Sequence, residues 1–214
     1  MRLGKDTVVA HCPNPGSMRT CADEGGRVWV QRRPGTKLGW SWELAEVGGR
    51  GGALVGVNTA RGNQLVAAAL AADAIAELTG HDTVEREVAT GASRLDFRLG
   101  RGAGRRHRDR TWVEVKTATM DGGDGAVAFP DAVTTRGARH LDELRALRRR
   151  GCRAVLLFVV NRSGASRVRP ADEIDPAYGQ ALRRAAAAGV EVLAYAVEHS
   201  LAGLALGRRL PVVT

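Results

Sequence analysis

The chain has 214 residues, of which 44% are hydrophobic and 26% charged, as in a globular protein with one large or two small domains. Its formal net charge of +9 favours an anionic partner. The three cysteines lack the spacing of a disulfide framework or a zinc site. No apolar run is long enough to cross a bilayer and no signal peptide is evident, so we expect a cytoplasmic protein without a membrane partner.

Residues 1–58 predict a small β domain. Short stretches rich in β-branched and aromatic residues alternate there with Pro-Gly and Gly-rich turns. The expected strands cover residues 7–11, 27–32, 40–47 and 53–57. Several short strands separated by turns are typical of a small barrel.

Residues 59–214 predict a second domain, of α/β (α+β) class, with a mixed sheet. The expected elements in chain order are a helix over 63–78 that ends before Gly80, strands over 83–88, 94–99 and 111–116, a helix over 134–150, a strand over 153–160, a helix over 176–188 and a strand over 191–197. A helix, three strands and then alternating helices and strands indicate a sheet of mixed polarity.

Two of these strands carry the strongest candidates for chemistry. Asp96 alternates with apolar residues on the first strand, and Glu114 and Lys116 share one face of the second. If the two strands pair antiparallel with Asp96 opposite Glu114, the two carboxylates lie about 4.5–5.5 Å apart on one face. Such a pair repels unless a cation neutralises it, and Mg²⁺ commonly binds one or two carboxylates together with phosphate oxygens. Lys116 would orient a water or stabilise the phosphate during phosphodiester hydrolysis.

The same residues have a simpler interpretation. A Glu-x-Lys pair on a strand often belongs to a solvated face, and Asp96, between Arg94 and Arg98, could be an ion-paired surface residue. Only three of the 32 Lys and Arg residues are lysines, so Lys116 departs from a strong arginine bias. The motif alone leaves both interpretations open.

Several basic residues are candidates for contacts with a nucleic-acid backbone. They are Arg94, Arg101, Arg105, Arg106 and Arg108 in or near the expected hairpin loop, and Arg136 and His140 on the helix over 134–150. Arg136 and His140 are four residues apart and therefore share a helix face, and the helix N-terminus could bind phosphate through its free N–H groups. A solvated loop and an ordinary amphipathic helix explain these two segments equally well.

Short motifs are distributed along the whole chain. They are residues 11–18 (HCPNPGSM), 57–59 (VNT), 93–97 (SRLDF), 114–116 (EVK), 129–132 (FPDA), 136–141 (RGARHL) and 210–212 (LPV). Together they resemble the sugar fermentation stimulation protein A family from about residue 9 to the end of the chain. The motif residues outside the candidate site are His11, Pro13, Asn14, Gly16, Asn58, Thr59 and Asp131.

The resemblance implies an N-terminal OB-like domain over 1–58 and a PD-(D/E)xK nuclease-like α/β domain over 59–214. It assigns metal binding to Asp96 and Glu114, and to Glu77 on the preceding helix, with Mg²⁺ or Mn²⁺ as the cation. It assigns the role of catalytic lysine to Lys116. Members of the family usually begin with a further basic strand, so we expect either a barrel without its first strand or a misassigned start.

The resemblance also implies a bacterial DNA-binding protein linked to regulation of sugar (maltose) metabolism. We expect sequence-nonspecific DNA binding and an intact nuclease-type site that Asp96→Ala would inactivate. The alternative is a non-catalytic DNA-binding regulator on a nuclease scaffold, and a sugar-binding protein follows only from the family's name. The sequence does not distinguish DNA from RNA, duplex from single strand, or a monomer from a homodimer.

Overall fold

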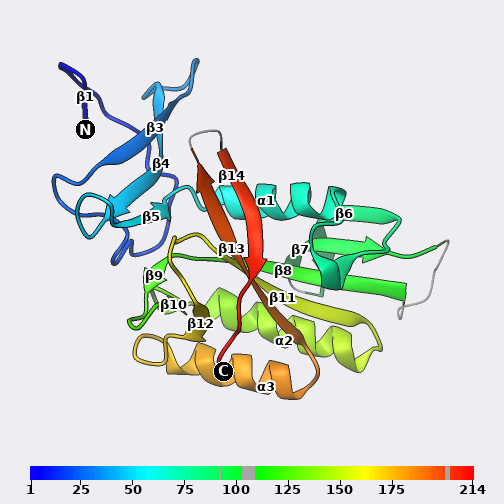
Figure 1. The fold of residues 1–214 in the computed structure, drawn as a ribbon. Helices are drawn as coiled ribbons and strands as arrows, with labels where there is room; N and C mark the ends of the chain where they lie inside the picture. The colour runs from blue at the N-terminus through cyan, green and yellow to red at the C-terminus, as the bar shows by residue number, and fades with distance from the viewer. Residues whose placement is uncertain (92, 103–108, 201–202) are drawn as a thin grey trace.

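The N-terminal part of the chain is an OB domain. The computed structural model describes residues 1–91, 93–102, 109–200 and 203–214 (Figure 1). A short hairpin of β1 (Arg2–Leu3) and β2 (Asp6–Thr7) precedes β3 (Val28–Arg32), β4 (Trp40–Val47) and β5 (Ala53–Gly56), which pair antiparallel in the order β3–β4–β5. A small core of buried residues lies beneath this sheet: Cys21, Ala45, Val47, Val55 and Val57.

Three of the four strands expected in this domain are confirmed to within one residue. The expected strand over 7–11 is wrong, because β2 ends at Thr7 and only His11 pairs, through an isolated bridge to Ser41. His11 donates its backbone N–H to the Trp40 carbonyl and accepts from the Trp42 N–H, both at 2.8 Å. The proline- and glycine-rich residues that follow His11 therefore run as a loop across the sheet edge.

The second domain is a mixed-sheet α/β domain. Its elements are α1 (Ala60–Ala71), the 3₁₀ helix η1 (Ala76–Leu78), β6 (Thr83–Thr90), β7 (Ser93–Gly100), β8 (Arg110–Ala118), β9 (Met120–Asp121), β10 (Ala126–Phe129), α2 (Thr135–Arg149), β11 (Arg153–Val160), β12 (Arg167–Pro170), α3 (Pro176–Ala187), β13 (Glu191–Ser200) and β14 (Gly203–Arg209). The main sheet has the order β14–β13–β11–β8–β7–β6, and a smaller one the order β12–β10–β9.

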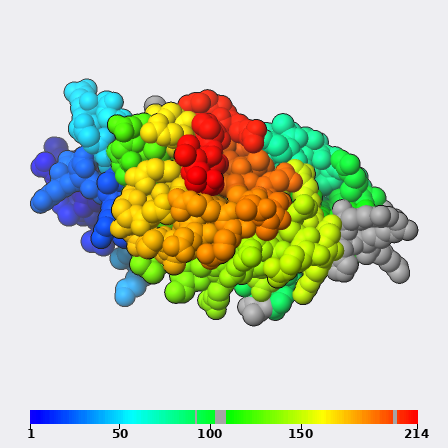
Figure 2. Space-filling model, turned by 90° about the horizontal axis from the view of Figure 1, so that it is seen from below, coloured from blue at the N-terminus to red at the C-terminus, as the bar shows by residue number. Residues whose placement is uncertain are grey.

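Helices cover both faces of the main sheet. Leu141 and Leu144 of α2 and Leu182 of α3 pack with one buried cluster, and Val66 and Leu70 of α1 pack with the other. Figure 1 shows α1 above the sheet and α2 and α3 below it, and Figure 2 shows α2 and α3 covering the lower face. The continuous apolar run of β11 is buried on both sides, as expected for a central parallel strand.

The helix expected over 63–78 is shorter than the sequence suggested. Helix α1 ends at Ala71, and Asp73 adopts a left-handed backbone with φ of 50° that no α-helix accommodates. Leu78 belongs to η1 instead, so Gly80 does not cap α1. The short strands β9, β10 and β12 and the hairpin strand β14 were not predicted. Strand β10 pairs with the distant β12, whereas β9 and β14 form local antiparallel pairs with β10 and β13.

The two domains are joined by backbone hydrogen bonds as well as by the chain. Gly56 N–H donates to the Asn161 carbonyl at 2.8 Å, and Ser163 N–H donates to the Leu54 carbonyl at 2.8 Å. Strand β5 thereby attaches to the residues that follow β11, which fixes the OB domain beside the carboxyl end of the parallel strands. No helix in the described part of the chain is long and apolar enough to cross a membrane.

Candidate active site

The paired strands β7 and β8 separate at the position of Asp96. Their ladder runs from Gly100↔Arg110 to Phe97↔Val113, and Asp96 and Glu114 are the next positions along the two strands, just beyond the last pair of the ladder. Beyond Phe97, the Val115 N–H donates to the Asp96 carboxylate (Oδ2, 2.7 Å) rather than to a strand carbonyl. The side chain of Asp96 therefore occupies the gap where the two strands part.

Strand β7 also changes face at this point. Leu95 packs into the core beneath α2, whereas Phe97 packs into the core beneath α1, so the expected simple alternation is interrupted. Glu87, opposite Asp96 on β6, has a φ of 52°, which is unusual for a non-glycine residue. Two strands are thus irregular at Asp96, and irregular strands commonly re-aim side chains next to functional sites.

The Asp96 carboxylate is held in a half-buried position by hydrogen-bond donors. Besides Val115 N–H, the Asn63 side chain on α1 donates to Oδ1 at 2.6 Å. Burial and the nearby charge of Glu114 raise the pKa of Asp96 to about 6, against the opposing effects of these donors and of Lys116. The charge of Glu114 therefore lies close enough to disfavour the ionised form of Asp96.

Glu114 is buried, with 2% of its surface exposed. Its Oε1 accepts from Lys116 Nζ at 2.6 Å and contacts His140 Nδ1, whereas Oε2 is buried without a hydrogen-bond partner among the described residues. Burial acts to raise the pKa of Glu114, but the His140 hydrogen bond and the Lys116 charge outweigh it, so the pKa lies below its usual value. One oxygen of Glu114 is thus neutralised within the chain and the other is left unpaired.

His140 reaches Glu114 from helix α2. The helix begins after Thr134, whose hydroxyl accepts from Gly137 N–H at 3.0 Å as an N-cap, in agreement with the predicted helix entry. Arg136 Nε donates to His140 Nε2 at 3.5 Å, which assigns the Nδ1 proton to the bond with Glu114. The prediction that His140 contacts nucleic acid is wrong, because its side chain is buried against Glu114; Arg136 is exposed beside it.

Lys116 lines a pocket of about 400 Å³ between the two domains. We call it the lysine pocket. Its wall includes Asn63 from α1, Asn14 and Gly16 from the loop after His11, and Asp131. The OB domain therefore supplies part of the wall around the candidate site.

The family-motif residues gather around this pocket. Ser17 Oγ donates to Asp131, to its carbonyl at 2.8 Å and to Oδ2 at 3.1 Å, and Gly16 lies so close to Asp131 Oδ2 that an added Cβ would clash. Thr59 donates its N–H and hydroxyl to the Pro13 carbonyl, and Asn14 accepts from Gly16 N–H.

Asn58 lies on the opposite side of Thr59 and donates to Glu43 of β4 at 3.1 Å. It also accepts from Ala60 N–H at 3.2 Å, at the start of α1. His11, by contrast, contributes backbone pairing to the OB sheet. The motifs therefore fix the junction between the two domains and the entry to α1.

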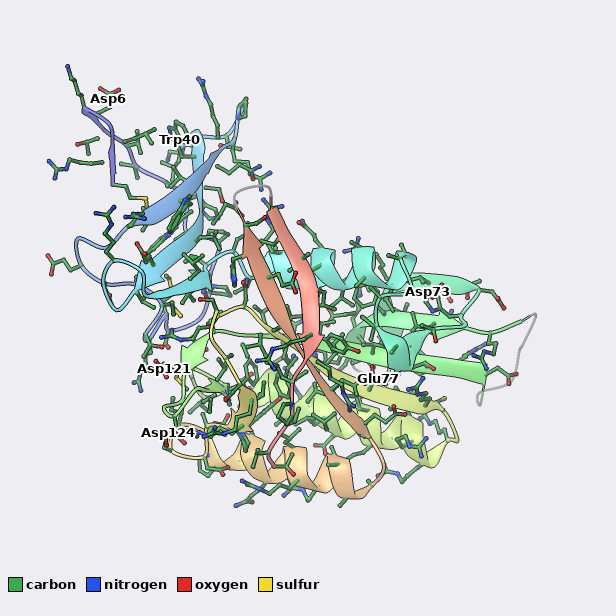
Figure 3. The ribbon with its side chains drawn as sticks, in the orientation of Figure 1. Asp6, Trp40, Asp73, Glu77, Asp121 and Asp124 are labelled. Carbon is green, nitrogen blue, oxygen red and sulfur yellow. The ribbon has the colours of Figure 1, made fainter. Side chains whose placement is uncertain are left out.

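Glu77 does not belong to this site. Its carboxylate accepts from Tyr195 Oη at 2.6 Å and pairs with Arg209 Nε at 2.8 Å, on strands β13 and β14 (Figure 3). The assignment of Glu77 to a metal is therefore wrong. Helix α1 ends before Glu77, and η1 directs its side chain to β13 and β14, at the edge of the main sheet far from β7. Asn63, which the sequence analysis did not single out, is the α1 residue that contacts Asp96.

The predicted basic residues lie in different places. Arg94 is exposed on β7, two residues before Asp96. Arg101 is exposed at the opposite end of β7, roughly 16 Å along the strand from Asp96, and donates to the Gly80 carbonyl. Arg101 itself is thus not beside the carboxylates. Arg105, Arg106 and Arg108 lie outside the described residues.

The sequence matches known family descriptions over both domains. Residues 60–203 match the description "Sugar fermentation stimulation protein RE domain", and residues 1–57 match "SfsA N-terminal OB domain". The chain belongs to the sugar fermentation stimulation protein family. The family predicted from the motifs is confirmed, as is the order of an OB domain followed by a mixed-sheet α/β domain.

Relatives of this family are similar over nearly the whole chain. The sugar fermentation stimulation protein homolog of Pseudomonas aeruginosa is 55% identical over 98% of this chain and 88% of its own length. The homolog of Azotobacter vinelandii is 53% identical over 97% and 87%. The solved structure of Pyrococcus furiosus SfsA in complex with Ca²⁺ aligns with a TM-score of 0.77 and 26% identity over 87% of this chain and 78% of that chain.

Proposed function

We propose that this family member is a DNA-binding protein whose second domain hydrolyses phosphodiesters with a divalent cation. The observation that carries the proposal is the juxtaposition of Asp96 and Glu114 at the point where β7 and β8 part, with Lys116 on the same strand as Glu114. Carboxylates on neighbouring strands with an adjacent lysine supply the charges that metal-dependent phosphodiester hydrolysis requires.

The residues present fit Mg²⁺ or Mn²⁺. Glu114 Oε2 is a buried acceptor without a partner among the described residues, and burial together with the Glu114 charge raises the pKa of Asp96 to about 6. Asp96 and Glu114 would hold the cation, and the described residues offer no third His, Cys, Asp or Glu side chain grouped with them so as to hold a metal. Two carboxylates suffice for Mg²⁺, which retains waters and binds substrate phosphate.

Each remaining residue has a distinct task in this reaction. A bound Mg²⁺ would neutralise both carboxylates and polarise the phosphodiester. Asn63 and the Val115 N–H hold Asp96 in its ionised form, and His140 orients Glu114 through Oε1. Lys116 lines the pocket, where its ammonium group can stabilise the negative charge that develops on the phosphate.

DNA binding without cleavage is the second candidate function. Lys116 and His140 both contact Glu114 Oε1, so part of the site's negative charge is already compensated within the chain. A scaffold stabilised in this way could bind DNA through its net charge of +9 without a metal. The connection with sugar fermentation in the relatives' names would then follow from the promoters that the protein occupies.

One experiment tests both candidates. Labelled duplex and single-stranded DNA are incubated with wild type, Asp96→Asn, Glu114→Gln and Lys116→Met in Mg²⁺, Mn²⁺ or EDTA. Asp142→Asn, an exposed carboxylate of α2 paired only with Arg145, is the matched control. We expect metal-dependent cleavage that the three site variants lose and the control retains. Salt-sensitive binding without cleavage in any metal would instead favour the non-catalytic regulator, and activity in Asp96→Asn would contradict the assigned site.

A further inference from the structure

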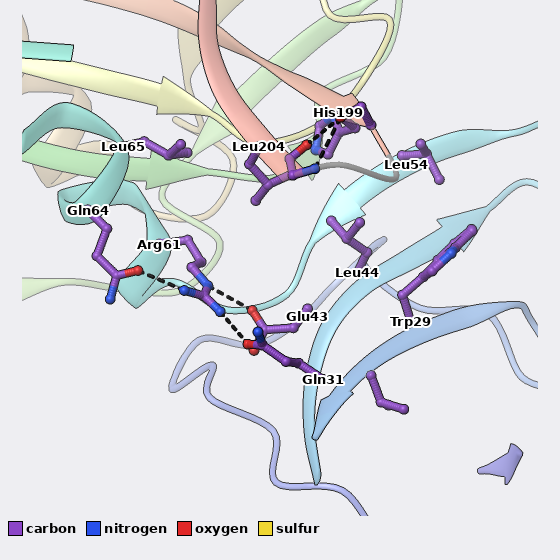
Figure 4. Close-up of a pocket in the computed structure, with 13 residues that line it drawn as sticks. Trp29, Gln31, Glu43, Leu44, Leu54, Arg61, Gln64, Leu65, His199 and Leu204 are labelled. Carbon is purple, nitrogen blue, oxygen red and sulfur yellow. Dashed lines mark hydrogen bonds and ion pairs between the residues drawn. The ribbon is translucent and has the colours of Figure 1, made fainter. Parts of the chain in front are cut away.

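A second and larger pocket lies on the other side of α1. It has a volume of about 700 Å³ and forms where β3 and β4 of the OB domain meet α1 and the β13–β14 hairpin (Figure 4). We call it the junction pocket. Clefts of this size at domain boundaries are common ligand sites. None of the motifs that define the lysine pocket lines it.

An irregular strand pairing shapes the OB side of the junction pocket. Trp29 pairs with Leu44 and Val30 with Trp42, so Glu43 is an extra residue that forms a bulge in β4. A bulge breaks the alternation of side chains and directs neighbouring residues to one face. As a result Trp29, Val30 and Gln31 all line the pocket, together with Glu43 and Leu44 from the facing strand.

A ring of polar groups forms the wall opposite Trp29. Arg61 of α1 donates to Glu43 Oε2 at 2.9 Å, to Gln64 Oε1 at 2.9 Å and to Gln31 Oε1 at 2.7 Å (Figure 4). The Arg61 and Glu43 charges cancel, so the pocket carries no excess charge for a phosphate. Because both glutamine carbonyl groups are bound, their amide NH₂ groups are the donors available to a ligand.

The third wall contains buried polar atoms without partners. His199 lines the pocket, and its Nε2 contacts Asn161 Oδ1 at 2.8 Å. His199 Nδ1 and Asn161 Nδ2 are both buried without a hydrogen-bond partner among the described residues, although Asn161 is fully buried. Buried polar atoms are usually paired, so their occurrence behind this pocket calls for an explanation.

We propose that the junction pocket binds one unpaired base of a single-stranded nucleic acid. A nucleobase is flat, which suits the indole of Trp29, and its edge carries acceptors, which suit the amide NH₂ groups of Gln31 and Gln64. A base within a duplex is stacked and paired and cannot enter such a pocket. This inference rests on the proposed nucleic-acid-binding function, because it specifies that the nucleic acid bound is single-stranded.

Charge around the pocket fits this ligand. Arg27 lies over the Trp29 ring at 5.9 Å from its centroid, and Arg33 and the exposed Arg32 are nearby on the same sheet. Arg27 pairs with Glu46 at 3.5 Å and Arg33 with Glu43 at 3.7 Å. The exposed Arg32 is therefore the side chain best placed to hold a phosphate of a strand whose base occupies the neutral interior. Helix α1 separates the two sites: Arg61 and Gln64 line the junction pocket, and Asn63 contacts Asp96 of the candidate active site. The distance between the sites is therefore about the width of a helix, on the order of 10 Å.

The proposal is tested by binding, which does not require cleavage. Fluorescence anisotropy in EDTA measures the affinity of the full chain for labelled oligothymidylate, oligouridylate and a blunt DNA duplex. Trp29→Leu removes the stacking surface, Trp29→Phe retains a ring, and Gln64→Ala removes an exposed amide without disturbing the OB core. Trp40→Leu, on β4 outside the pocket, is the matched control, and Asp96→Asn reports on the active site.

We expect Trp29→Leu to weaken binding of both single strands by about 5- to 100-fold and Gln64→Ala to weaken it less, while Trp29→Phe and Trp40→Leu stay near wild type. The duplex should be unaffected. Unchanged single-strand affinity in Trp29→Leu and Gln64→Ala, or equal loss of duplex binding, would overturn the proposal even if the protein cleaves DNA. Retained Trp29-dependent binding without cleavage in any metal would overturn only the nuclease.

Discussion

Asn63 of α1 donates a 2.6 Å hydrogen bond to the carboxylate of Asp96 on β7. The bond joins the first helix of the second domain to the strand that carries the first acidic residue of the candidate site. Burial and the charge of Glu114 raise the pKa of Asp96 to about 6. A hydrogen-bond donor that favours the ionised form of Asp96 therefore also favours cation binding. Asn63 is therefore a positioning residue for the proposed site.

Replacement of Asn63 tests this role. Hydrogen bonds to charged groups typically contribute about 1.5–3 kcal/mol, so we expect Asn63→Ala to raise the Mg²⁺ concentration for half-maximal cleavage by about ten-fold or more. The pKa of Asp96 in the metal-free protein should rise as well, which carboxyl NMR titration measures. Asp142→Asn, at the exposed carboxylate of α2 that pairs with Arg145, should leave the Mg²⁺ requirement unchanged. An unaltered requirement in Asn63→Ala would contradict the role of this bond.

The charge of Glu114 is a second determinant of the Asp96 pKa. Burial is the larger cause of the upward shift and the Glu114 charge the next. We therefore expect Glu114→Gln to lower the pKa of Asp96 from about 6 without returning it to its usual 3.8. Carboxyl NMR titration of the metal-free variant measures the change. A pKa that stays near 6 would show that the two carboxylates do not interact.

The raised pKa of Asp96 also predicts how stability depends on pH. Since the folded protein binds this proton more tightly than the unfolded chain does, the ionised carboxylate costs stability above pH about 6, and the cost vanishes as the pH falls to the unfolded value of 3.8. Without metal, Asp96→Asn should therefore be more stable than wild type at about pH 8 and lose that advantage near pH 4. Urea unfolding at both pH values measures the difference, and an advantage independent of pH would exclude this cause.

The bond between Ser17 and Asp131 predicts that the OB domain shapes the lysine pocket. Asp131→Ala removes the 3.1 Å bond to Oδ2 but keeps the 2.8 Å bond to the backbone carbonyl, whereas Ser17→Ala removes both. We expect both variants to show faster amide hydrogen exchange in the loop after His11 and a higher KM for cleavage. Both effects should be larger in Ser17→Ala than in Asp131→Ala. Because Ser17 is exposed, global stability should change by no more than about 0.5 kcal/mol. Equal kinetics in all three proteins would exclude this role.

Elements whose signal is local were predictable from the sequence. The apolar run of residues 153–160 and the alternation around Asp96 and Glu114 each specify a strand within a few residues. The register between the latter two strands does not follow from these local patterns, since a slip of one residue fits the same strand bounds. The ladder from Gly100↔Arg110 to Phe97↔Val113 fixes it, and Asp96 and Glu114 are the positions that follow.

Relationships between distant residues were not predictable in the same way. The left-handed conformation of Asp73 ends α1 and removes Glu77 from the site, yet nothing in the alanine-rich sequence before it marks this end. Asn63 and Asp96 are 33 positions apart, and an asparagine on a helix usually faces water. His140 was expected on a solvated face because periodicity does not reveal the buried carboxylate of Glu114 that faces α2.

Asp175 joins α3 to the start of α2, and its removal should cause a large loss of stability. Its buried carboxylate accepts from Tyr178 N–H at 2.9 Å as the N-cap of α3 and from Thr134 N–H at 2.8 Å. Loss of a cap and of a buried acceptor predicts that Asp175→Ala lowers the free energy of unfolding by about 2–4 kcal/mol. Urea denaturation measures this, with Asp172→Asn at an exposed pair with Arg183 as the control of small effect. Equal losses in the two variants would mean that the buried bonds of Asp175 contribute no more than a surface ion pair.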